Sequence, residues 1–346
     1  MRFGPLAVDK AKGAVLAHSV KAAKTRLRKG LILGVDDLAL LRGAGIDRVT
    51  VLRLDPGDVH ENTAAQRLAQ ALVPDPAASG LRLAVPFTGR VNITADGPGV
   101  VVLDVAAIER FNRIHPMITI ATVAPFQQMA AGGLVATIKI ISYAVPGDDV
   151  ARAALAAPSA LRLAGPVFAS AGLVVTNIPG GPSNDKGIRA IEGRITALGM
   201  ELAQTITVPH DRDALAGALG RVAGDMALIL TGSATSDPDD VAPAALRHAG
   251  GRVERFGMPV DPGNLLFLGD LGARPVIGLP GCARSPALNG ADWVLSRVAC
   301  GVPVTGDDIA GMGVGGLLKE IPTRPQPRVR SRAGSHAEPG TDPHKG

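Results

Sequence analysis

The sequence predicts an α/β protein in three parts: a mixed α+β domain over residues 1–160, a three-layer α/β/α sandwich with a mainly parallel sheet over 165–318, and a disordered C-terminal tail over 319–346. After residue 170, apolar strands alternate with helical patterns of about ten to fifteen residues, which indicates parallel strands joined by right-handed crossovers. β-Branched runs between residues 81 and 145 indicate a further sheet in the first domain. The tail is rich in proline, arginine and serine and has too little apolar surface to fold.

The first domain combines helical and strand patterns. Residues 35–45 have apolar side chains at helical spacing, an acidic first turn and glycines at the end, so we expect a helix there. Residues 61–72 repeat that spacing. The other expected elements are strands at 48–54, 100–105, 118–123 and 135–145, a turn at 55–58, and a domain boundary within 146–166 that contains a further helix.

The second domain alternates strands with helices along its whole length. The expected strands are 173–176, 201–208, 226–230 and two more near Val253 and Val276, and the expected helices are 184–198, 212–222, 241–248 and 287–300. In an open α/β sheet, ligands bind in the crevice at the carboxyl ends of the strands. Turn-rich loops follow apolar runs at 231–240, 261–264 and 280–286, so we expect the functional site where these loops meet.

The composition excludes several classes of protein. Aromatic residues are only 3% of the chain, which argues against a base-stacking nucleic-acid surface. The net charge is +5, but the tail from Ile321 holds five basic residues against two acidic ones, which leaves about +2 for the rest. Two cysteines make no disulfide framework, and no apolar run is long enough for a membrane span or forms a signal peptide. We therefore expect a cytoplasmic protein that binds neither nucleic acid nor membrane.

The loop from Asn177 to Gly187 is rich in glycine and precedes a helix. Backbone N–H groups at a helix start attract phosphate, and Lys186 adds a positive charge. The alternative is a solvated turn in which Ser183 or Asn184 caps the helix. The segment has neither the dinucleotide fingerprint nor a nucleotide P-loop, so its residues leave both interpretations open.

The loop from Thr231 to Asp240 combines hydroxyls, a glycine and three carboxylates just before a helix. Hydroxyls and open amides suit an anion, whereas carboxylates suit Mg²⁺, which prefers one or two of them together with phosphate oxygens and water. The alternative for Asp239 or Asp240 is an ordinary helix N-cap, which is the more common role of such a residue.

The remaining two loops each place proline at the second and glycine at the third position of an expected type II turn, at Asp261–Asn264 and Leu279–Cys282. A thiolate at Cys282 can attack an electrophile or bind a metal, although a small buried cysteine is the more common state. The seven histidines have no metal-ligand spacing, so we predict no zinc site.

Taken together, these loops resemble the molybdopterin-binding domain shared by molybdopterin adenylyltransferases and molybdopterin molybdotransferases. That family has a Thr-Gly-Gly loop that ends in an essential aspartate, then a Pro-Gly turn, then a Leu-Pro-Gly-Asn-Pro turn. The resemblance covers about Ala171 to Gly301. The matching residues are Thr231-Gly232, Asp240, Pro262-Gly263 and Leu279-Pro280-Gly281.

Segments of the first domain are similar to a narrower bacterial group of molybdopterin-binding proteins, in which a nucleotidyltransferase that attaches CMP or GMP to the cofactor often follows the binding module. These segments are Lys29-Gly30, Pro56–Val59, Gly89–Asn92 and Val135–Ile141. No nucleotidyltransferase follows Glu320 in this sequence, and the C-terminal β domain of molybdotransferases does not follow Gly301. We therefore expect the binding module to stand alone or apart from its partner.

The sequence also departs from the family pattern. Asp261 and Asn264 stand where molybdotransferases have lysines, which removes two positive charges from an anion site. Ser233 replaces the second glycine of the first loop, and Cys282-Ala283 replaces Asn-Pro. These departures support binding better than catalysis.

The resemblance implies a molybdenum cofactor biosynthesis protein that binds molybdopterin or adenylated molybdopterin, with Mg²⁺-dependent insertion of molybdate and loss of AMP as its transferase reaction. The alternative is a non-catalytic carrier that presents the cofactor to a nucleotidyltransferase or a molybdoenzyme, and a weaker one is a binder of another phosphorylated metabolite. A homo-oligomer is also implied. Asp240 is the expected catalytic residue, and Asp239 and Asp240 are the expected metal ligands. The expected cofactor-binding residues are Thr231, Gly232, Ser233, Thr235, Ser236, Ser183, Lys186, Pro262, Gly263, Asn264, Pro280, Gly281, Cys282 and Ser285.

Overall fold

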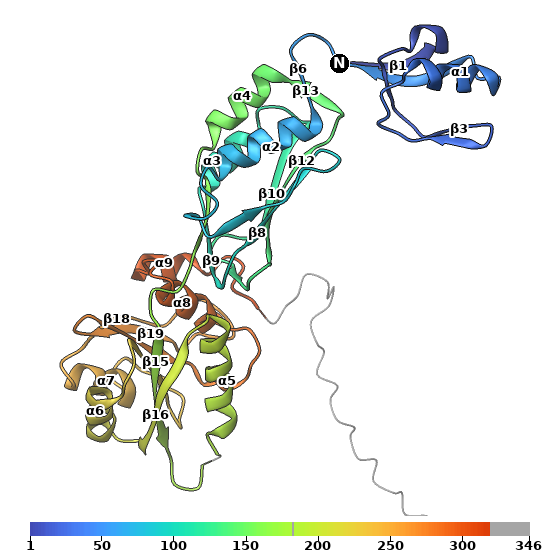
Figure 1. Cartoon of the computed structure of the whole chain (residues 1–346). Helices are drawn as coiled ribbons and strands as arrows, with labels where there is room; N and C mark the ends of the chain where they lie inside the picture. The colour runs from blue at the N-terminus through green and yellow to red at the C-terminus, as the bar shows by residue number, and fades with distance from the viewer. Residues whose placement is uncertain (182, 319–346) are drawn as a thin grey trace, which may run out of the picture.

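The computed structural model of the chain describes residues 1–181 and 183–318. The expected disordered tail over 319–346 lies outside these residues. The fold has three successive groups of elements, which Figure 1 shows as an N-terminal unit, a middle unit and a C-terminal α/β/α unit. No helix in the described part of the chain has the length and apolar character needed to cross a membrane.

The N-terminal unit is a small sheet with one helix and a projecting hairpin. Its sheet has the order β1-β5-β2, and the hairpin is formed by β3 and β4. The elements are β1 (Arg2–Ala7), a 3-10 turn (Val8–Lys10), β2 (Val15–Leu16), β3 (Val20–Ala22), β4 (Thr25–Leu27), α1 (Val35–Gly43) and β5 (Arg48–Arg53). Leu16, Leu38, Leu41 and Val51 form a core of its own, which is separate from the core of the next unit.

The middle unit packs three helices on one face of an antiparallel sheet with the order β10-β12-β8-β7 (Figure 1). Its core includes Leu68, Ile93, Phe111 and Ile138. The elements are β6 (Asp58–His60), α2 (Glu61–Leu72), β7 (Leu81–Leu83), β8 (Arg90–Ala95), β9 (Gly99–Leu103), α3 (Val105–Asn112), β10 (Ile118–Thr122), β11 (Gln128–Met129), β12 (Leu134–Ile140), β13 (Ala144–Pro146), α4 (Gly147–Ala156) and β14 (Leu161–Ala164).

The C-terminal unit is the predicted three-layer α/β/α sandwich. Its sheet has the order β16-β15-β17-β20-β19-β18, in which the first four strands are parallel. The elements are β15 (Ser170–Asn177), α5 (Asp185–Ala197), β16 (Glu201–Pro209), α6 (Arg212–Arg221), β17 (Met226–Leu230), α7 (Val241–His248), β18 (Arg252–Phe256), β19 (Phe267–Leu271), β20 (Arg274–Leu279), a 3-10 turn (Gly281–Arg284), α8 (Gly290–Ala299) and α9 (Gly306–Gly311).

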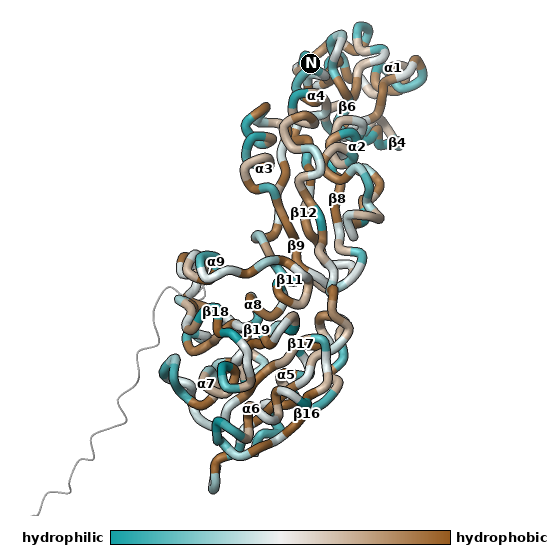
Figure 2. The backbone as a smooth tube through the Cα atoms, turned by 90° about the vertical axis from the view of Figure 1, so that its left-hand side faces the viewer, coloured by the Kyte–Doolittle hydropathy of each residue, from teal (hydrophilic) through white to brown (hydrophobic). Residues whose placement is uncertain are grey.

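The central strand of this sheet is buried on both faces, which is why it is apolar at every position. β17 is hydrophobic along its length (Figure 2), and all five of its residues are buried. Leu228 and Leu230 point to the layer of α5 and α8, whereas Ala227 and Ile229 point to the layer of α6 and α7. The predicted fold class, an α/β/α sandwich with a mainly parallel sheet after a mixed α+β region, is therefore confirmed.

Several local predictions need correction. The strand expected near Val253 is β18, which ends at Phe256, so the 261–264 loop does not begin at its end. β19 was not predicted, because glycine and aspartate interrupt its apolar pattern. The strand expected over 135–145 is divided into β12 and β13. Within the expected boundary segment, β14 pairs with β9, so its residues continue the middle unit. The domain boundaries themselves stay a prediction.

Candidate functional site

The carboxyl ends of β15, β17 and β20 lie side by side at one edge of the sheet. Val175 of β15 is in register with Leu230 of β17, and Leu230 is in register with Leu279 of β20. The loops that follow these three strands therefore begin next to one another. They start at Ile178, Thr231 and Pro280, and they form the crevice that the order of the elements predicts.

Arg284 joins all three of these loops. Its Nη1 donates a hydrogen bond to Oδ1 of Asn184 (2.7 Å), and its Nη2 donates to the carbonyl oxygen of Thr231 (2.8 Å). Arg284 itself belongs to the 3-10 turn after β20. The guanidinium is partly buried, and this burial lowers the pKa of Arg284. A positively charged group thus lies where the three loops meet, and the sequence analysis did not select it.

A glycine on α5 makes room for this arginine. A Cβ atom at Gly187 would lie 3.2 Å from both Cγ and Nη1 of Arg284, and 3.0 Å from Cδ2 of Leu230. Such contacts are tighter than normal packing allows, so a side chain here would push against the arginine or the strand. The first turn of α5 is therefore shaped to the arginine, and a glycine in an otherwise regular helix was the available sequence signal.

Thr176 and His210 form a hydrogen-bonded pair that contacts the loop after β17. The Thr176 hydroxyl accepts a hydrogen bond from the Gly232 N–H (2.9 Å) and lies 2.9 Å from Nδ1 of His210. A Cβ atom at position 232 would lie 2.8 Å from the Thr176 carbonyl oxygen. The glycine of the Thr-Gly motif is therefore needed for close approach of the two backbones. Neither Thr176 nor His210 was predicted from sequence.

An open groove extends from this point along the loop after β15. It has a volume of about 680 Å³ and lies between that loop, the start of α5 and the end of β16. Ser183 lines the groove, and its hydroxyl accepts a hydrogen bond from the Asp185 N–H (3.2 Å). Lys186 is exposed on the first turn of α5. The local contacts of Ser183 fit the capping alternative, while the position of Lys186 leaves its ammonium available to a ligand.

Two of the hydroxyls predicted to bind the cofactor are used inside their own loop. Thr231 Oγ1 donates to the Ser233 carbonyl oxygen (2.6 Å) and lies 3.3 Å from Thr235 Oγ1. Both threonines are buried, whereas Ser233 and Ser236 are exposed. The structure therefore places the threonines as supports of the loop and the two serines on its surface. Their roles in ligand binding stay predictions.

Asp240 is the N-cap of α7. Its Oδ1 accepts a hydrogen bond from the Val241 N–H (2.7 Å), and its Oδ2 accepts one from the Ser236 N–H (3.0 Å). Each bond satisfies a backbone donor that the helix or the loop leaves open. The carboxylate thus fixes the end of the 231–240 loop, which is the ordinary structural role that the sequence analysis set beside the catalytic one.

The structure gives Asp239 and Asp240 partners within the protein, and their role as metal ligands stays a prediction. The Asp239 side chain is 92% exposed and forms an ion pair with Arg247 (2.8 Å). Both oxygens of Asp240 already accept backbone N–H groups. In residues 1–181 and 183–318, no group of three or more His, Cys, Asp or Glu side chains could hold a metal ion. We therefore derive no catalytic step from a metal here.

The Pro262-Gly263 turn packs against the start of α8. The Pro262 carbonyl oxygen accepts a hydrogen bond from the Gly290 N–H (2.8 Å), and a Cβ atom at Gly263 would lie 2.8 Å from the same nitrogen. Asn264 donates from its side chain to the Met258 carbonyl oxygen (3.3 Å). The expected type II turn is not formed, because Gly263 has a φ of 145°, whereas this turn type needs about 80° at that position. The turn thus contacts the start of α8, the helix that follows the loop after β20.

The loop after β20 is a 3-10 turn, so the type II turn expected at Leu279–Cys282 is also wrong. Gly281 does not have the positive φ that this turn type requires, and the Ala283 N–H donates to the Pro280 carbonyl oxygen (2.9 Å). Pro280 is buried, Cys282 is half-buried, and Gly281 and Ser285 are exposed. The predicted cofactor-binding residues of this loop therefore lie beside Arg284, and their contacts with a ligand stay predictions.

Arg194 of α5, which is far from this loop in sequence, forms hydrogen bonds to it. It donates to the carbonyl oxygens of Ala283 (2.9 Å), Ser285 (2.8 Å) and Ala287 (3.1 Å). Its Nε also pairs with Oδ1 of Asp292 on α8 (2.5 Å). The Arg194 side chain is only 9% exposed. One buried arginine thus fixes both the loop and the start of the helix that follows it.

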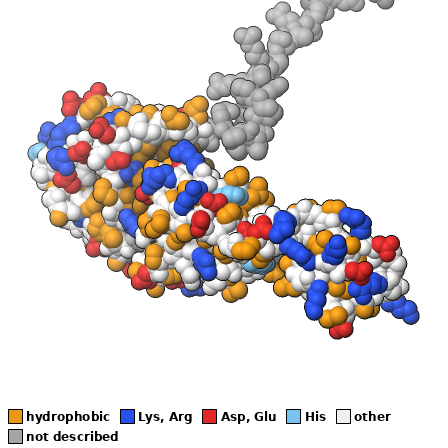
Figure 3. Space-filling model, turned by 90° about the horizontal axis from the view of Figure 1, so that it is seen from above, with side chains coloured by type: hydrophobic (Ala, Val, Ile, Leu, Met, Phe, Trp, Pro, Cys, Tyr) orange, Lys and Arg blue, Asp and Glu red, His pale blue; other side chains and the backbone are white. Residues whose placement is uncertain are grey.

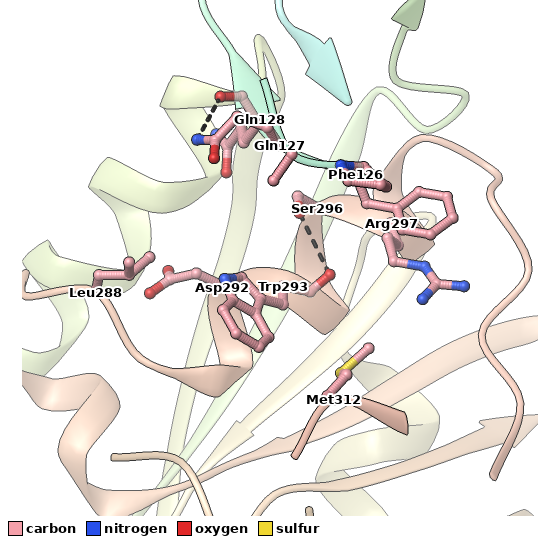
Figure 4. A pocket seen from close by; sticks show the side chains of 11 residues that line it. Phe126, Gln127, Gln128, Leu288, Asp292, Trp293, Ser296, Arg297 and Met312 are labelled. Carbon is pink, nitrogen blue, oxygen red and sulfur yellow. Dashed lines mark hydrogen bonds between the residues drawn. The ribbon is translucent and has the colours of Figure 1, made fainter. Parts of the chain in front are cut away.

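A smaller cavity, which Asp292 lines, lies between α8 and the 124–128 segment of the middle unit. It has a volume of about 280 Å³. Figure 4 shows Asp292 and Trp293 on one side of it and Gln127 and Gln128 on the other. The guanidinium carbon of Arg297 lies 4.1 Å from the centre of the Phe126 ring, which joins the two units at this point.

An α/β/α sheet with glycine- and hydroxyl-rich loops at adjacent carboxyl strand ends defines a ligand-binding domain of the doubly wound class. Residues 173–297 match the family model of a probable molybdopterin binding domain, and residues 5–53 match a domain of unknown function. The likeness to this family lies within the α/β/α domain, from β15 to α8. A comparison with curated proteins gave no match.

Solved structures that match this chain include two proteins from Pyrococcus. One is described as a molybdopterin biosynthesis MoeA protein from Pyrococcus horikosii, with a TM-score of 0.30 and 14% identity over 87% of this chain and 75% of that chain. The other is a molybdenum cofactor biosynthesis protein from Pyrococcus furiosus, with a TM-score of 0.23 and 14% identity over 90% of this chain and 65% of that chain. The likeness to the molybdopterin-binding domain rests on the match of residues 173–297 and not on these structures.

Proposed function

We propose that the α/β/α domain binds molybdopterin or adenylated molybdopterin in the crevice at the carboxyl ends of β15, β17 and β20, and so serves molybdenum cofactor biosynthesis. The observation that carries this proposal is the position of Arg284, whose guanidinium joins the three loops that begin there. A guanidinium binds phosphate through charge-assisted, forked hydrogen bonds. The match of this domain to the molybdopterin-binding family supplies the ligand.

In this proposal the phosphate end of the ligand lies against Arg284, and the groove beside the start of α5 takes the adjoining part of the ligand. The groove volume of about 680 Å³ is within the range of sites for small molecules. Lys186 and Ser236, both exposed at the crevice loops, are the next polar groups for the ligand to meet. In this proposal the binding energy comes mainly from the partly buried guanidinium of Arg284 and from contacts between the ligand and the walls of the groove.

Two finer functions remain to be separated, which are insertion of molybdate with loss of AMP and non-catalytic carriage of the cofactor to a nucleotidyltransferase or molybdoenzyme. One observation favours the carrier. Both carboxylate oxygens of Asp240 hold backbone N–H groups, so the expected catalytic residue already has a structural task. Asp261 and Asn264 also remove two positive charges relative to molybdotransferases.

Two variants of Asp240 separate these functions. Asp240→Ala removes the cap of α7 and is expected to lower the free energy of unfolding by about 1 kcal/mol, whereas Asp240→Asn keeps a capping side chain and should retain stability. Urea unfolding measures this difference. Conversion of adenylated molybdopterin in the presence of molybdate is then assayed with the wild type and Asp240→Asn.

Loss of conversion in the stable Asp240→Asn variant would assign a catalytic role to the carboxylate. If the wild type binds the pterin but converts none of it, the carrier function is supported. Failure of the purified wild type to bind molybdopterin or its adenylated form in a fluorescence titration would remove both functions.

Cysteine labelling gives an independent view of the site. Cys300 is buried, and this burial raises the pKa of its thiol to about 11, so iodoacetamide at pH 8 should leave it unmodified in the folded protein. Cys282 is half-buried beside Arg284 and should be alkylated. Mass spectrometry of the digested protein measures both sites, and unfolded protein, in which both react, is the control. Bound molybdopterin should slow the labelling of Cys282, and an unchanged rate at saturating ligand would place the pterin elsewhere.

A further inference from the structure

The N-terminal unit carries most of the positive charge of the folded chain. Residues 1–53 contain eleven Lys and Arg residues against four Asp residues, whereas residues 54–318 contain nineteen Lys and Arg against twenty-four Asp and Glu. Figure 3 shows Lys and Arg side chains spread over the N-terminal unit with few acidic side chains between them. The small net charge of the whole body therefore hides a strongly basic unit beside an acidic remainder.

The most concentrated part of this charge is the β3–β4 hairpin. Five cations occur within nine residues, and all five are exposed: Lys21, Lys24, Arg26, Arg28 and Lys29. Lys21 and Arg26 are directly opposite each other across the two strands. Ala22 and Leu27 of the same strands are buried in the core of the unit. The hairpin thus has an apolar inner side and a cationic outer side.

This arrangement is unfavourable for the protein alone. Two like charges directly opposite each other on a β-ribbon repel and destabilise the pair. No ion pair reaches any of the five cations from a carboxylate in residues 1–181 or 183–318. Of the four Asp residues of this unit, Asp9 pairs with Arg42, and Asp37 accepts the Gly34 N–H. An anion from outside the chain would relieve the repulsion.

The hairpin also encloses a hollow of suitable chemistry. Its volume is about 350 Å³, and its lining consists of three cations and two hydroxyl residues, namely Lys21, Lys24, Arg26, Ser19 and Thr25. Ammonium, guanidinium and hydroxyl groups are all hydrogen-bond donors, and together they match the acceptor oxygens of phosphoryl groups. The lining includes no carboxylate.

We propose that the β3–β4 hairpin is a second binding site, which takes a small ligand that carries two or more phosphoryl groups. The size of the hollow and the two hydroxyls favour a compact ligand. A long nucleic-acid strand that extended beyond the unit would meet the net negative charge of residues 54–318. This site is independent of the pterin site, because its residues belong to a different unit with a separate core.

The test is a calorimetric titration of the full-length protein with inorganic tripolyphosphate as the probe. The variant Lys21→Gln/Arg26→Gln removes two charges from the hairpin. The matched control Lys10→Gln/Lys12→Gln removes two charges from exposed lysines of the same unit outside the hairpin. We expect the hairpin variant to bind about tenfold more weakly or worse, since it loses two charge-assisted contacts, and the control to stay within about twofold of the wild type.

Three results would overturn the proposal. The first is no binding of tripolyphosphate to the wild type at low salt. The second is an equal loss in both variants, which would mean that only the net charge of the unit matters. The third is a single-stranded oligonucleotide that binds much more tightly than tripolyphosphate and depends on Lys21 and Arg26, which would identify the hairpin as a nucleic-acid surface. Unchanged binding of molybdopterin in the hairpin variant is expected, so failure here leaves the pterin site untouched.

Discussion

Replacement of Arg284 by alanine is expected to weaken molybdopterin binding by about ten- to a hundredfold. A hydrogen bond to a charged group contributes about 1.5–3 kcal/mol, and each 1.4 kcal/mol corresponds to a factor of about ten in the dissociation constant. The arginine is also the link between Asn184 and the Thr231 carbonyl oxygen, so the loops around the ligand lose a common partner. A fluorescence or calorimetric titration of the purified variant measures the effect.

Two further variants make this prediction specific. Arg284→Lys keeps the positive charge but lacks the fork that reaches two acceptors, so its affinity should lie between those of the wild type and Arg284→Ala. Arg221→Ala removes an exposed arginine at the C-terminus of α6, which lies at the opposite edge of the sheet from the crevice, and should bind as the wild type does. Equal affinity of Arg284→Ala and Arg221→Ala would show that the ligand does not use the crevice at Arg284.

The elements of the α/β/α domain could be predicted because their signals are local. Residues 226–230 and 241–248 coincide with β17 and α7, since an apolar run bounded by turn residues and a capped amphipathic segment each identify themselves within a few positions. The capping role of Asp240 could be predicted for the same reason, because its signal is also local in sequence. A residue just before a helix acts on backbone groups that are its neighbours in sequence.

The residues that form the centre of the site could not be predicted in this way. Arg284 meets Asn184, one hundred positions away, and Arg194 meets Asp292, ninety-eight positions away. No periodicity or short motif connects such pairs, because the contact depends on which strands the fold makes adjacent. Two of the three loops expected to meet, 231–240 and 280–286, begin side by side, but the third loop beside them follows β15 and is not 261–264. Thr231 and Asp240, which the sequence analysis emphasised, form hydrogen bonds within their own loop.

Replacement of Arg194 by alanine is expected to have the largest effect on stability, a loss of about 3 kcal/mol in the free energy of unfolding. Removal of one partner of a buried ion pair leaves the other charge without compensation, which costs about 3–5 kcal/mol. The Asp292 side chain is only 14% exposed, so the variant would leave a largely buried carboxylate without its cationic partner. The carbonyl oxygens of Ala283, Ser285 and Ala287 would lose their donor as well.

Arg252→Ala is the matched control for this variant. Arg252 also pairs with carboxylates at short distance, Asp270 at 2.9 Å and Glu254 at 2.5 Å, but its side chain is 67% exposed. Solvent screens exposed pairs, so this variant should unfold at nearly the wild-type urea concentration. The double variant Arg194→Ala/Asp292→Ala should recover part of the loss, because no buried charge remains without a partner. If the midpoint of unfolding falls no further in Arg194→Ala than in Arg252→Ala, the loop after β20 is held by its own turn and the buried arginine does not fix the shape of the crevice.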